Sequence, residues 1–538
     1  MTFTSFRGWA SAAVVVATLT MTTGAQQMQP AATRGAGDGD GPHERLVIRG
    51  VTVIDGTGAP PRGPMDIVVV QDRITEISSV GFPMVPVPDR GRPAKGTREI
   101  DGTGMYVMPG LVDLHVHCGG NQANDPDYVY RLWLAHGVTT VRGVPCGNMD
   151  WDLEQRELSA KNQIVAPRIF AYHRPFTGQG WDRARPQTPD NAREWVRFAA
   201  KKGIDGLKLG AYDPEIMAAL LDEAGKLGLG STAHLDQMGV GRMNAVQASR
   251  LGLRDLTHYY GLFESLLKDT SLQPYPVAQN YNDEQHRFGQ VARLWDKIHP
   301  QGSDRWNALI QEWVDSGFVI NPTMTIYSAS RDVMRMREAE WHDRYTLPSL
   351  WDFYQPNRIA HGSYWFDWTT EDEVAWKNFY HVWMAFLNDF KNAGGRVVTG
   401  SDSGFIYQTY GFGYILELEM LQEAGFHPLE VVRAATLHAA ETLHEPKDAS
   451  IEFGILRAGL KADLVITKEN PLQNFKTLYG TGHLRVNDAT NQPERVGGID
   501  VVVKDGIVYD AKKLLADVAA KVEKAKAARR APTSAPQR

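Results

Sequence analysis

The chain of 538 residues has only two cysteines, no excess of basic residues and no long apolar run after its N-terminus. Two cysteines are too few for a disulfide-built scaffold. A net charge of −6 without a basic stripe argues against nucleic acid as a partner. Since no later stretch approaches the ~18 apolar residues of a membrane span, we expect a mature chain without membrane association.

The N-terminus is typical of a secretory signal peptide. Arg7 precedes an apolar run over residues 10–19, and small residues follow at 23–25. We therefore expect residues 1–25 to be cleaved and the protein to be secreted or periplasmic; an uncleaved anchor is the alternative. The composition of residues 26–44 predicts a disordered lead-in. The tail over residues 511–538 is expected to be helical or disordered.

Short β-branched runs occur near both ends of the chain. They cover residues 46–54, 66–77 and 98–100 at one end and residues 462–466 and 498–508 at the other. Neither set closes a sheet alone. We therefore predict one small β-sandwich domain assembled from residues 45–108 and 450–510.

Between these runs, short apolar strands alternate with helix-length amphipathic segments, which indicates parallel β/α units. The candidate strands cover residues 110–115, 138–142, 168–171, 206–209, 230–234, 255–258, 318–321 and 396–400. Eight such strands predict an α/β fold, a (β/α)₈ TIM-like barrel over residues 109–449. An open doubly wound sheet is disfavoured because the chain lacks a Gly-rich dinucleotide turn.

Two connections, over residues 261–315 and 327–392, are much longer than the usual loop. The second contains six of the fourteen Trp residues, namely Trp341, Trp351, Trp365, Trp368, Trp376 and Trp383. Two interpretations stay open for this insertion. It is either a helical decoration with its own core or an aromatic lid over the mouth of the barrel.

Six side chains able to bind metal or carry protons fall at or near the C-terminal ends of five candidate strands. His115 and His117 are two residues apart on the first strand, so both leave the same face. A buried ammonium at Lys208 is costly unless its charge changes, as carbamylation by CO₂ would achieve. The remaining three are His234, His258 and Asp402. Strand C-terminal ends are where barrel enzymes place their chemistry.

With these residues in this order, the chain resembles the amidohydrolase superfamily, in particular its imidazolonepropionase-like and prolidase-like metal hydrolases. The matching segments, in the family's order, are residues 108–117, 137–142, 206–209, 231–235, 256–258, 321–323, 399–404, 434–440 and 459–466. The resemblance implies a hydrolase that cleaves an amide or other C–N bond of a small molecule. The implied substrate is of the dipeptide or N-acyl amino acid type.

Carried over by position, the resemblance also implies a binuclear metal site with a metal-bridging hydroxide. His115, His117 and Asp402 would hold one divalent ion, His234 and His258 the other, and carbamylated Lys208 would bridge both. Zn²⁺ is the expected metal. Asp402 would carry the proton from the attacking hydroxide to the leaving nitrogen.

The chain departs from the family pattern at a few positions. Ser401 replaces the usual Thr before Asp402, which retains a hydroxyl. Tyr259 and Tyr260 follow His258 in place of a small residue, and either contact a substrate carboxylate or simply pack. Gln237 stands where related mononuclear deaminases typically have Glu, so a deaminase is disfavoured.

Several features of the protein stay open from the sequence alone. The metal ligands do not exclude a cyclic-amide hydrolase. A non-catalytic binding relative is a remote alternative, because such a protein should have lost metal ligands and none is missing here. The sequence does not determine whether the chain forms a homo-oligomer. Cys118 and Cys146 follow the first and second candidate strands. Neighbouring strand ends are close enough for a disulfide between them, and two buried thiols are the second interpretation.

Overall fold

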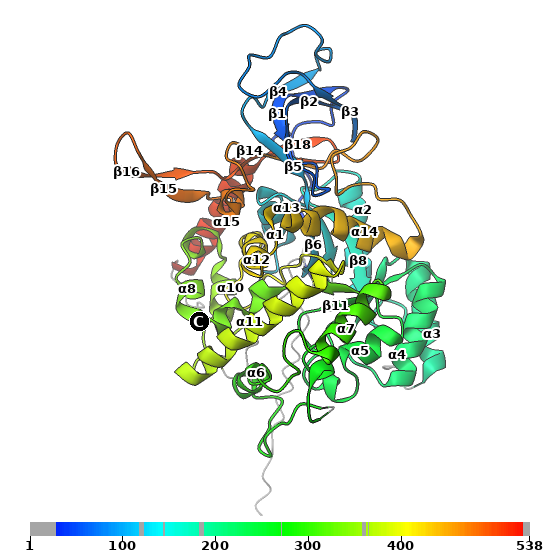
Figure 1. The fold of residues 1–538 in the computed structure, drawn as a ribbon. Coiled ribbons are helices and arrows are strands. Elements are labelled where there is room, and N and C mark those ends of the chain that lie inside the picture. The colour runs from blue at the N-terminus through cyan, green and yellow to red at the C-terminus, as the bar shows by residue number, and fades with distance from the viewer. Residues whose placement is uncertain are drawn as a thin grey trace, which may run out of the picture.

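A computed structural model describes residues 28, 30–117, 123–143, 146–181, 188–270, 272–357, 362–363 and 365–530. A curled sheet surrounded by helices forms the larger part of the molecule, and a second sheet lies at one end of it (Figure 1). No helix in these ranges is long and apolar enough to cross a membrane.

The curled sheet has eight strands in the order β13-β12-β11-β10-β9-β8-β7-β6, and all of its neighbours pair in parallel. The strands are β6 (Leu111–Val116), β7 (Val138–Gly143), β8 (Arg168–His173), β9 (Gly206–Leu209), β10 (Gly230–Ala233), β11 (Asp255–Thr257), β12 (Val319–Asn321) and β13 (Arg396–Val397). Each coincides with one of the eight candidate strands of the sequence.

Backbone hydrogen bonds also join the first strand to the segment after the last. The N–H of Leu114 donates to Thr399 O (2.9 Å), and the N–H of Asp402 donates to His115 O (2.8 Å). The fold is therefore α/β, with a curled parallel eight-stranded sheet consistent with a TIM-like barrel.

Helices follow most of these strands, as expected for β/α units. They are α1 (Pro126–Ala135), α2 (Met149–Ala160), α3 (Pro189–Lys202), α4 (Pro214–Lys226), α5 (Ala245–Arg250), α6 (Glu284–Ala292), α7 (Asp304–Asp315), α8 (Val333–Arg337), α9 (His342–Tyr345), α10 (Pro348–Phe353), α11 (Thr370–Asn392), α12 (Phe412–Glu423), α13 (Pro428–Arg433) and α14 (Ala439–His444). Side-chain caps begin many of them; Thr369 and Asp372, for example, form a capping box at α11.

The second sheet contains strands from both ends of the chain. Its order is β18-β17-β14-β5-β1-β2-β3, and β4 also pairs with β1. The strands are β1 (Leu46–Val53), β2 (Arg62–Val70), β3 (Arg73–Ser79), β4 (Arg98–Asp101), β5 (Tyr106–Pro109), β14 (Leu464–Thr467), β17 (Ile499–Lys504) and β18 (Ile507–Asp510). Both ends share one sheet, and a two-layered sandwich is not confirmed. A hairpin of β15 (His483–Asn487) and β16 (Gln492–Val496) projects from the molecule (Figure 1).

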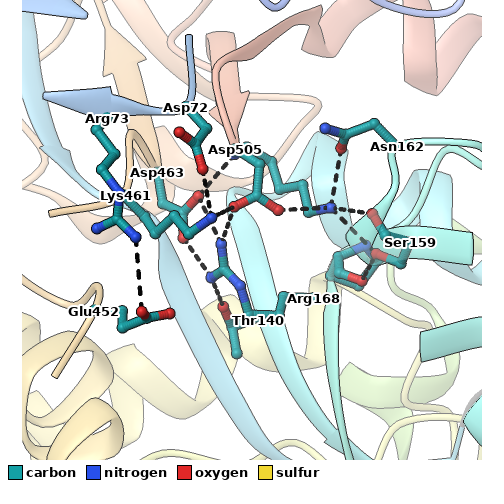
Figure 2. A network of polar contacts seen from close by, with 12 residues as sticks. Asp72, Arg73, Thr140, Ser159, Asn162, Arg168, Glu452, Lys461, Asp463 and Asp505 are labelled. Carbon is teal, nitrogen blue, oxygen red and sulfur yellow. Dashed lines mark hydrogen bonds and ion pairs between the residues drawn. The ribbon is translucent and has the colours of Figure 1, made fainter. Parts of the chain in front are cut away.

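A network of charges joins this terminal sheet to the start of the barrel strands (Figure 2). Arg168, the first residue of β8, pairs with Asp463 (2.6 Å) and also contacts Asp505. Lys504, fully buried at the end of β17, donates to the backbone O of Ser159 (2.7 Å). Because these contacts lie at the N-terminal ends of the strands, they leave the opposite rim open for chemistry.

The first and last described segments of the chain pack against the rest of the molecule. Residues 30–44 were predicted to be part of a disordered lead-in, yet Thr33 and Asp40 form backbone bridges to Ile164 and Val508. These backbone hydrogen bonds help to offset the conformational entropy that the segment loses when it becomes ordered. At the other end, residues 511–530 form a helix, α15 (Ala511–Arg530), which packs against α1.

Candidate metal centre

The two histidines of the first barrel strand lie at its C-terminal end. His115 is the penultimate residue of β6 and is 1% exposed, and His117 directly follows the strand. The segment after β13 approaches them closely at Gly400. A Cβ at that position would lie 2.6 Å from Oδ1 of Asn321 and 2.9 Å from Cβ of His115, so this approach requires glycine.

The carboxylate of Asp402 lies between three of the predicted ligands. Its Oδ1 is 3.1 Å from Nε2 of His117 and 3.6 Å from Nε2 of His115, and its Oδ2 is 3.6 Å from Nε2 of His258. Burial raises the pKa of Asp402, but His117 and His258 lower it by more, so the pKa lies below its ordinary value. The carboxyl is therefore ionised at neutral pH.

The ligand atoms of His115, His258 and Asp402 all lie within 4.8 Å of one another. His234, at the end of β10, is next to this group, because its ring centroid is 4.7 Å from that of His258. Burial lowers the pKa of His115 well below its ordinary value, and Lys208 lowers it further. A neutral imidazole is the form that binds metal.

Lys208 lies on β9, beside Thr232 in the register with β10. Its side chain is buried, and Nζ has no hydrogen-bond partner within the described part of the chain. Burial lowers the pKa of this amine well below its ordinary value, and Arg174 lowers it further. The environment therefore favours an uncharged, nucleophilic amine. Lys208 and His234 line the same cavity.

A series of buried polar side chains leads from the barrel interior to His115. Sequence alone did not identify it. Arg142 donates two hydrogen bonds to Asp255 (2.6 and 3.2 Å), and Asp255 accepts a hydrogen bond from Thr232. Thr232 lies 2.8 Å from Thr257, whose hydroxyl is 3.4 Å from Nδ1 of His115. All of these groups are buried, so this series fixes the ring from the barrel interior.

Asp113 organises the junction of β6 with the Asp402 segment. It accepts hydrogen bonds from the N–H of Ser401 (2.9 Å) and of His115 (3.2 Å), and from the hydroxyl of Ser401 (2.5 Å). Burial raises the pKa of Asp113 to about 7. The sequence signal that could have identified Asp113 is its place two residues before His115, on the same face of the strand. The hydroxyl of Ser401, which stands where the family usually has Thr, therefore donates a hydrogen bond to Asp113.

A cavity of about 680 Å³ has Lys208, His234 and Tyr260 in its wall. Among the other residues that line it are Arg174, Tyr281, Arg287 and Phe288. Arg287 lies on α6, within an insertion that the sequence could not place against the barrel. None of the six Trp residues of the second insertion lines this cavity, and Trp376 and Trp383 are fully buried. This favours packing over an aromatic lid.

The two tyrosines after His258 differ in their surroundings. Tyr259 packs against the rings of Tyr327, Trp376, Phe379 and Trp383. Tyr260 stacks on His234 (4.6 Å between ring centroids) and lines the cavity, and its hydroxyl lies 3.0 Å from that of Tyr327. Of the two, Tyr260 lines the cavity and Tyr259 does not.

Of the two cysteines, Cys146 is fully buried and disulfide-bonded. Cys118 lies outside the described residues, so its pairing stays a prediction.

Comparisons with known proteins give partial matches to hydrolytic enzymes. No protein-family model matches the chain. An adenine deaminase of Methanoculleus marisnigri is 34% identical over 121 residues, which is 21% of this chain and 22% of that protein. An N-acyl-D-aspartate deacylase of Alcaligenes xylosoxydans is 30% identical over 190 residues, covering 33% of this chain and 34% of that protein. The matches thus span a third or less of this chain and about a third or less of either relative.

Solved structures match over most of the chain. A Xaa-Pro dipeptidase with methionine in its active site covers 87% of this chain and 100% of its own, with a TM-score of 0.56 and 17% identity. The bottromycin amidohydrolase covers 90% of this chain and 91% of its own, with a TM-score of 0.61 and 19% identity. At these identities the likeness is one of fold.

Proposed function

We propose that the chain is a member of the amidohydrolase superfamily and a metal-dependent hydrolase of an amide or related C–N bond. The observation that carries the proposal is the convergence of His115, His258 and Asp402 at the C-terminal ends of the barrel strands. The proposed substrate is a small molecule of the dipeptide or N-acyl amino acid type. The similarity to an N-acyl-D-aspartate deacylase supports this class.

The donor set fits divalent metal. Imidazole nitrogens and a carboxylate are ligands suited to Zn²⁺. His115, His117 and Asp402 would hold one ion and His234 and His258 the other. The buried amine of Lys208 fits as the bridge once carbamylated, because its Nζ has no hydrogen-bond partner among the described residues. The carbamate would replace an uncompensated buried amine with an anionic ligand.

The chemistry that two such ions would supply when bound is an activated water and polarisation of the scissile carbonyl. The chain's own contribution is proton transfer at Asp402. Its carboxylate is ionised, so it would accept a proton from the attacking water and return it to the leaving nitrogen. Asp113 and Ser401 hold this segment in place.

The cavity beside Lys208 and His234 is the proposed substrate pocket, with Tyr260 as part of its wall. We also propose that residues 109–449 form a closed (β/α)₈ barrel and that residues 45–108 and 450–510 form the attached β domain. Residues 1–25 would be the export signal of a secreted or periplasmic enzyme.

The test is a substrate screen with metal-loaded enzyme. Dipeptides, N-acyl amino acids, cyclic amides and adenine are offered in parallel, and release of free amine, ring-opened product or ammonia is measured. We expect amine release from dipeptides or N-acyl amino acids, abolished by a chelator and by Asp402→Asn. Ammonia release alone would establish a deaminase instead.

A further inference from the structure

Thr323 lies directly behind His258 in the wall of the metal centre. It follows β12 through Pro322 and is completely buried. Its hydroxyl donates to the backbone O of Pro322 (2.6 Å) and contacts Nδ1 of His258. A Thr hydroxyl has a single proton, and here that proton is directed to Pro322. Towards His258 the oxygen is therefore an acceptor.

This assignment determines the tautomer of His258. If the Thr323 oxygen accepts, Nδ1 carries the ring proton and Nε2 keeps its lone pair. Nε2 is the atom that faces the cluster, 3.6 Å from Oδ2 of Asp402. The hydroxyl of Thr323 thus presents the donor nitrogen of the ring to the metal position.

The backbone at Thr323 has an unusual conformation for a β-branched residue. Its φ is +49° and its ψ is 44°, in the left-handed region that such residues rarely adopt. A residue persists there only when its surroundings hold it, and such positions cluster at functional sites.

Glu417 is the group that holds this turn. It lies on α12, is fully buried, and its Oε2 accepts a hydrogen bond from the N–H of Thr325 (2.7 Å). The N–H groups of Thr323 and Met324 are directed at the same carboxyl group. The hydroxyl of Thr325 is fixed in addition by Gln408 (3.0 Å). Through Glu417, α12 thus holds the turn that carries Thr323.

We propose that Thr323 is a positioning residue that sets the tautomer and orientation of His258, and that Glu417 holds Thr323 in its left-handed turn. The inference rests on the proposed function only in assigning His258 as a metal ligand.

The test compares two substitutions of similar size. Thr323→Val keeps the β-branch but removes the acceptor oxygen, whereas Thr323→Ser keeps the oxygen. Metal affinity is measured by competition with a chelator. We expect Thr323→Val to bind metal ~10–100-fold more weakly and Thr323→Ser to bind close to wild type. Equal affinities for wild type and Thr323→Val would overturn the proposal, and so would equal losses in the Val and Ser variants.

A matched control separates positioning from general damage to the core. Thr436 is also fully buried, and its hydroxyl donates to Val432 O (2.7 Å) without contacting the site. Thr436→Val should leave metal affinity unchanged. For Glu417, Ala is expected to weaken metal binding as Thr323→Val does, whereas Gln retains an acceptor oxygen and is expected to preserve it. Wild-type affinity in Glu417→Ala would remove Glu417 from the proposal.

A second measurement does not depend on metal. Nitrogen NMR of metal-free protein with labelled histidine is expected to show His258 with its proton on Nδ1, and Thr323→Val is expected to lose this preference. A proton on Nε2 in the wild type would contradict the inference. A wild type that has the predicted tautomer but binds no metal would instead contradict the proposed function.

Discussion

Oδ1 of Asp402 lies 3.1 Å from Nε2 of His117, which brings a residue after the last barrel strand against one after the first. Asp402 is both a proposed ligand and the proposed proton carrier. Asp402→Asn should therefore keep the fold but lower kcat by ~10²–10⁴-fold, because an amide cannot transfer the proton. Steady-state kinetics at equal metal loading test this. Activity within a few-fold of wild type would move the base elsewhere, and Asp236, which lines the cavity beside Lys208 and His234, would be the first candidate.

The buried amine of Lys208 leads to a second prediction. Lys208→Ala should lose at least one metal ion and nearly all activity, and short-chain carboxylic acids should restore part of it by replacing the carbamate. The contrast is Lys504→Ala, which removes an equally buried lysine far from the site. It should lower the melting temperature but retain the metal, as measured by mass spectrometry. Full metal content and turnover in Lys208→Ala would contradict the bridging role.

The ion pair of Arg142 with Asp255 is 0% and 2% exposed. Arg142→Met would leave a buried carboxylate unpaired and should lower the free energy of unfolding by about 3–5 kcal/mol. Arg250→Met is the control, because its partner Glu312 and its own side chain are partly exposed. That variant should change the free energy by less than about 1 kcal/mol. Urea denaturation measures both, and equal effects would contradict the argument from burial.

The charge network at the base of the barrel predicts a pH dependence of stability. Burial raises the pKa of Asp505, but Arg168 and Lys504 lower it by more, so its folded pKa lies below the ordinary value. The stabilisation is therefore complete above the unfolded pKa of about 3.9 and is lost as the pH falls below it. Urea midpoints between pH 7 and pH 3 should decrease, and Arg168→Met should flatten this decrease.

The control for this titration is Arg73→Met. Arg73 belongs to the same network, but it pairs with Glu452 at a largely exposed position. Its removal should leave the acid part of the stability curve unchanged. A curve flattened equally by both substitutions would mean that Asp505 is not its source.

The cysteines give a further prediction, because Cys146 is disulfide-bonded and the only other cysteine of the chain is Cys118. Thiol labelling of the denatured, unreduced protein should find no reactive thiol. Reduction should loosen metal binding before the barrel unfolds, since Cys118 directly follows His117. Two reactive thiols per chain would rule the bridge out.

Periodicity predicted the barrel strands well, because the alternation of short apolar strands with amphipathic helix-length segments is a local pattern of the sequence. All eight candidate strands are present, and His115, His258 and Asp402 converge as their order implied. The supporting contacts were not predictable in the same way. Asp255 and Glu417 act through partners 113 and 92 residues away, Arg142 and Thr325. No local pattern marks such pairs.

The same reason explains one more difference between expectation and structure, and it decides one question that the sequence left open. Residues 30–44 have the composition of a disordered segment, but backbone bridges to distant strands order part of it. For the Trp residues of the second insertion, a lid and a core were both open from the sequence, and the burial of Trp376 and Trp383 and their packing around Tyr259 favour the core.

The most direct test of a metal-dependent hydrolase is titration of metal-free enzyme with Zn²⁺ while turnover of an N-acyl amino acid or dipeptide is followed. The account predicts no turnover without metal and full turnover after two equivalents per chain. Full turnover in the metal-free enzyme would contradict it, and saturation at one equivalent would contradict the binuclear centre.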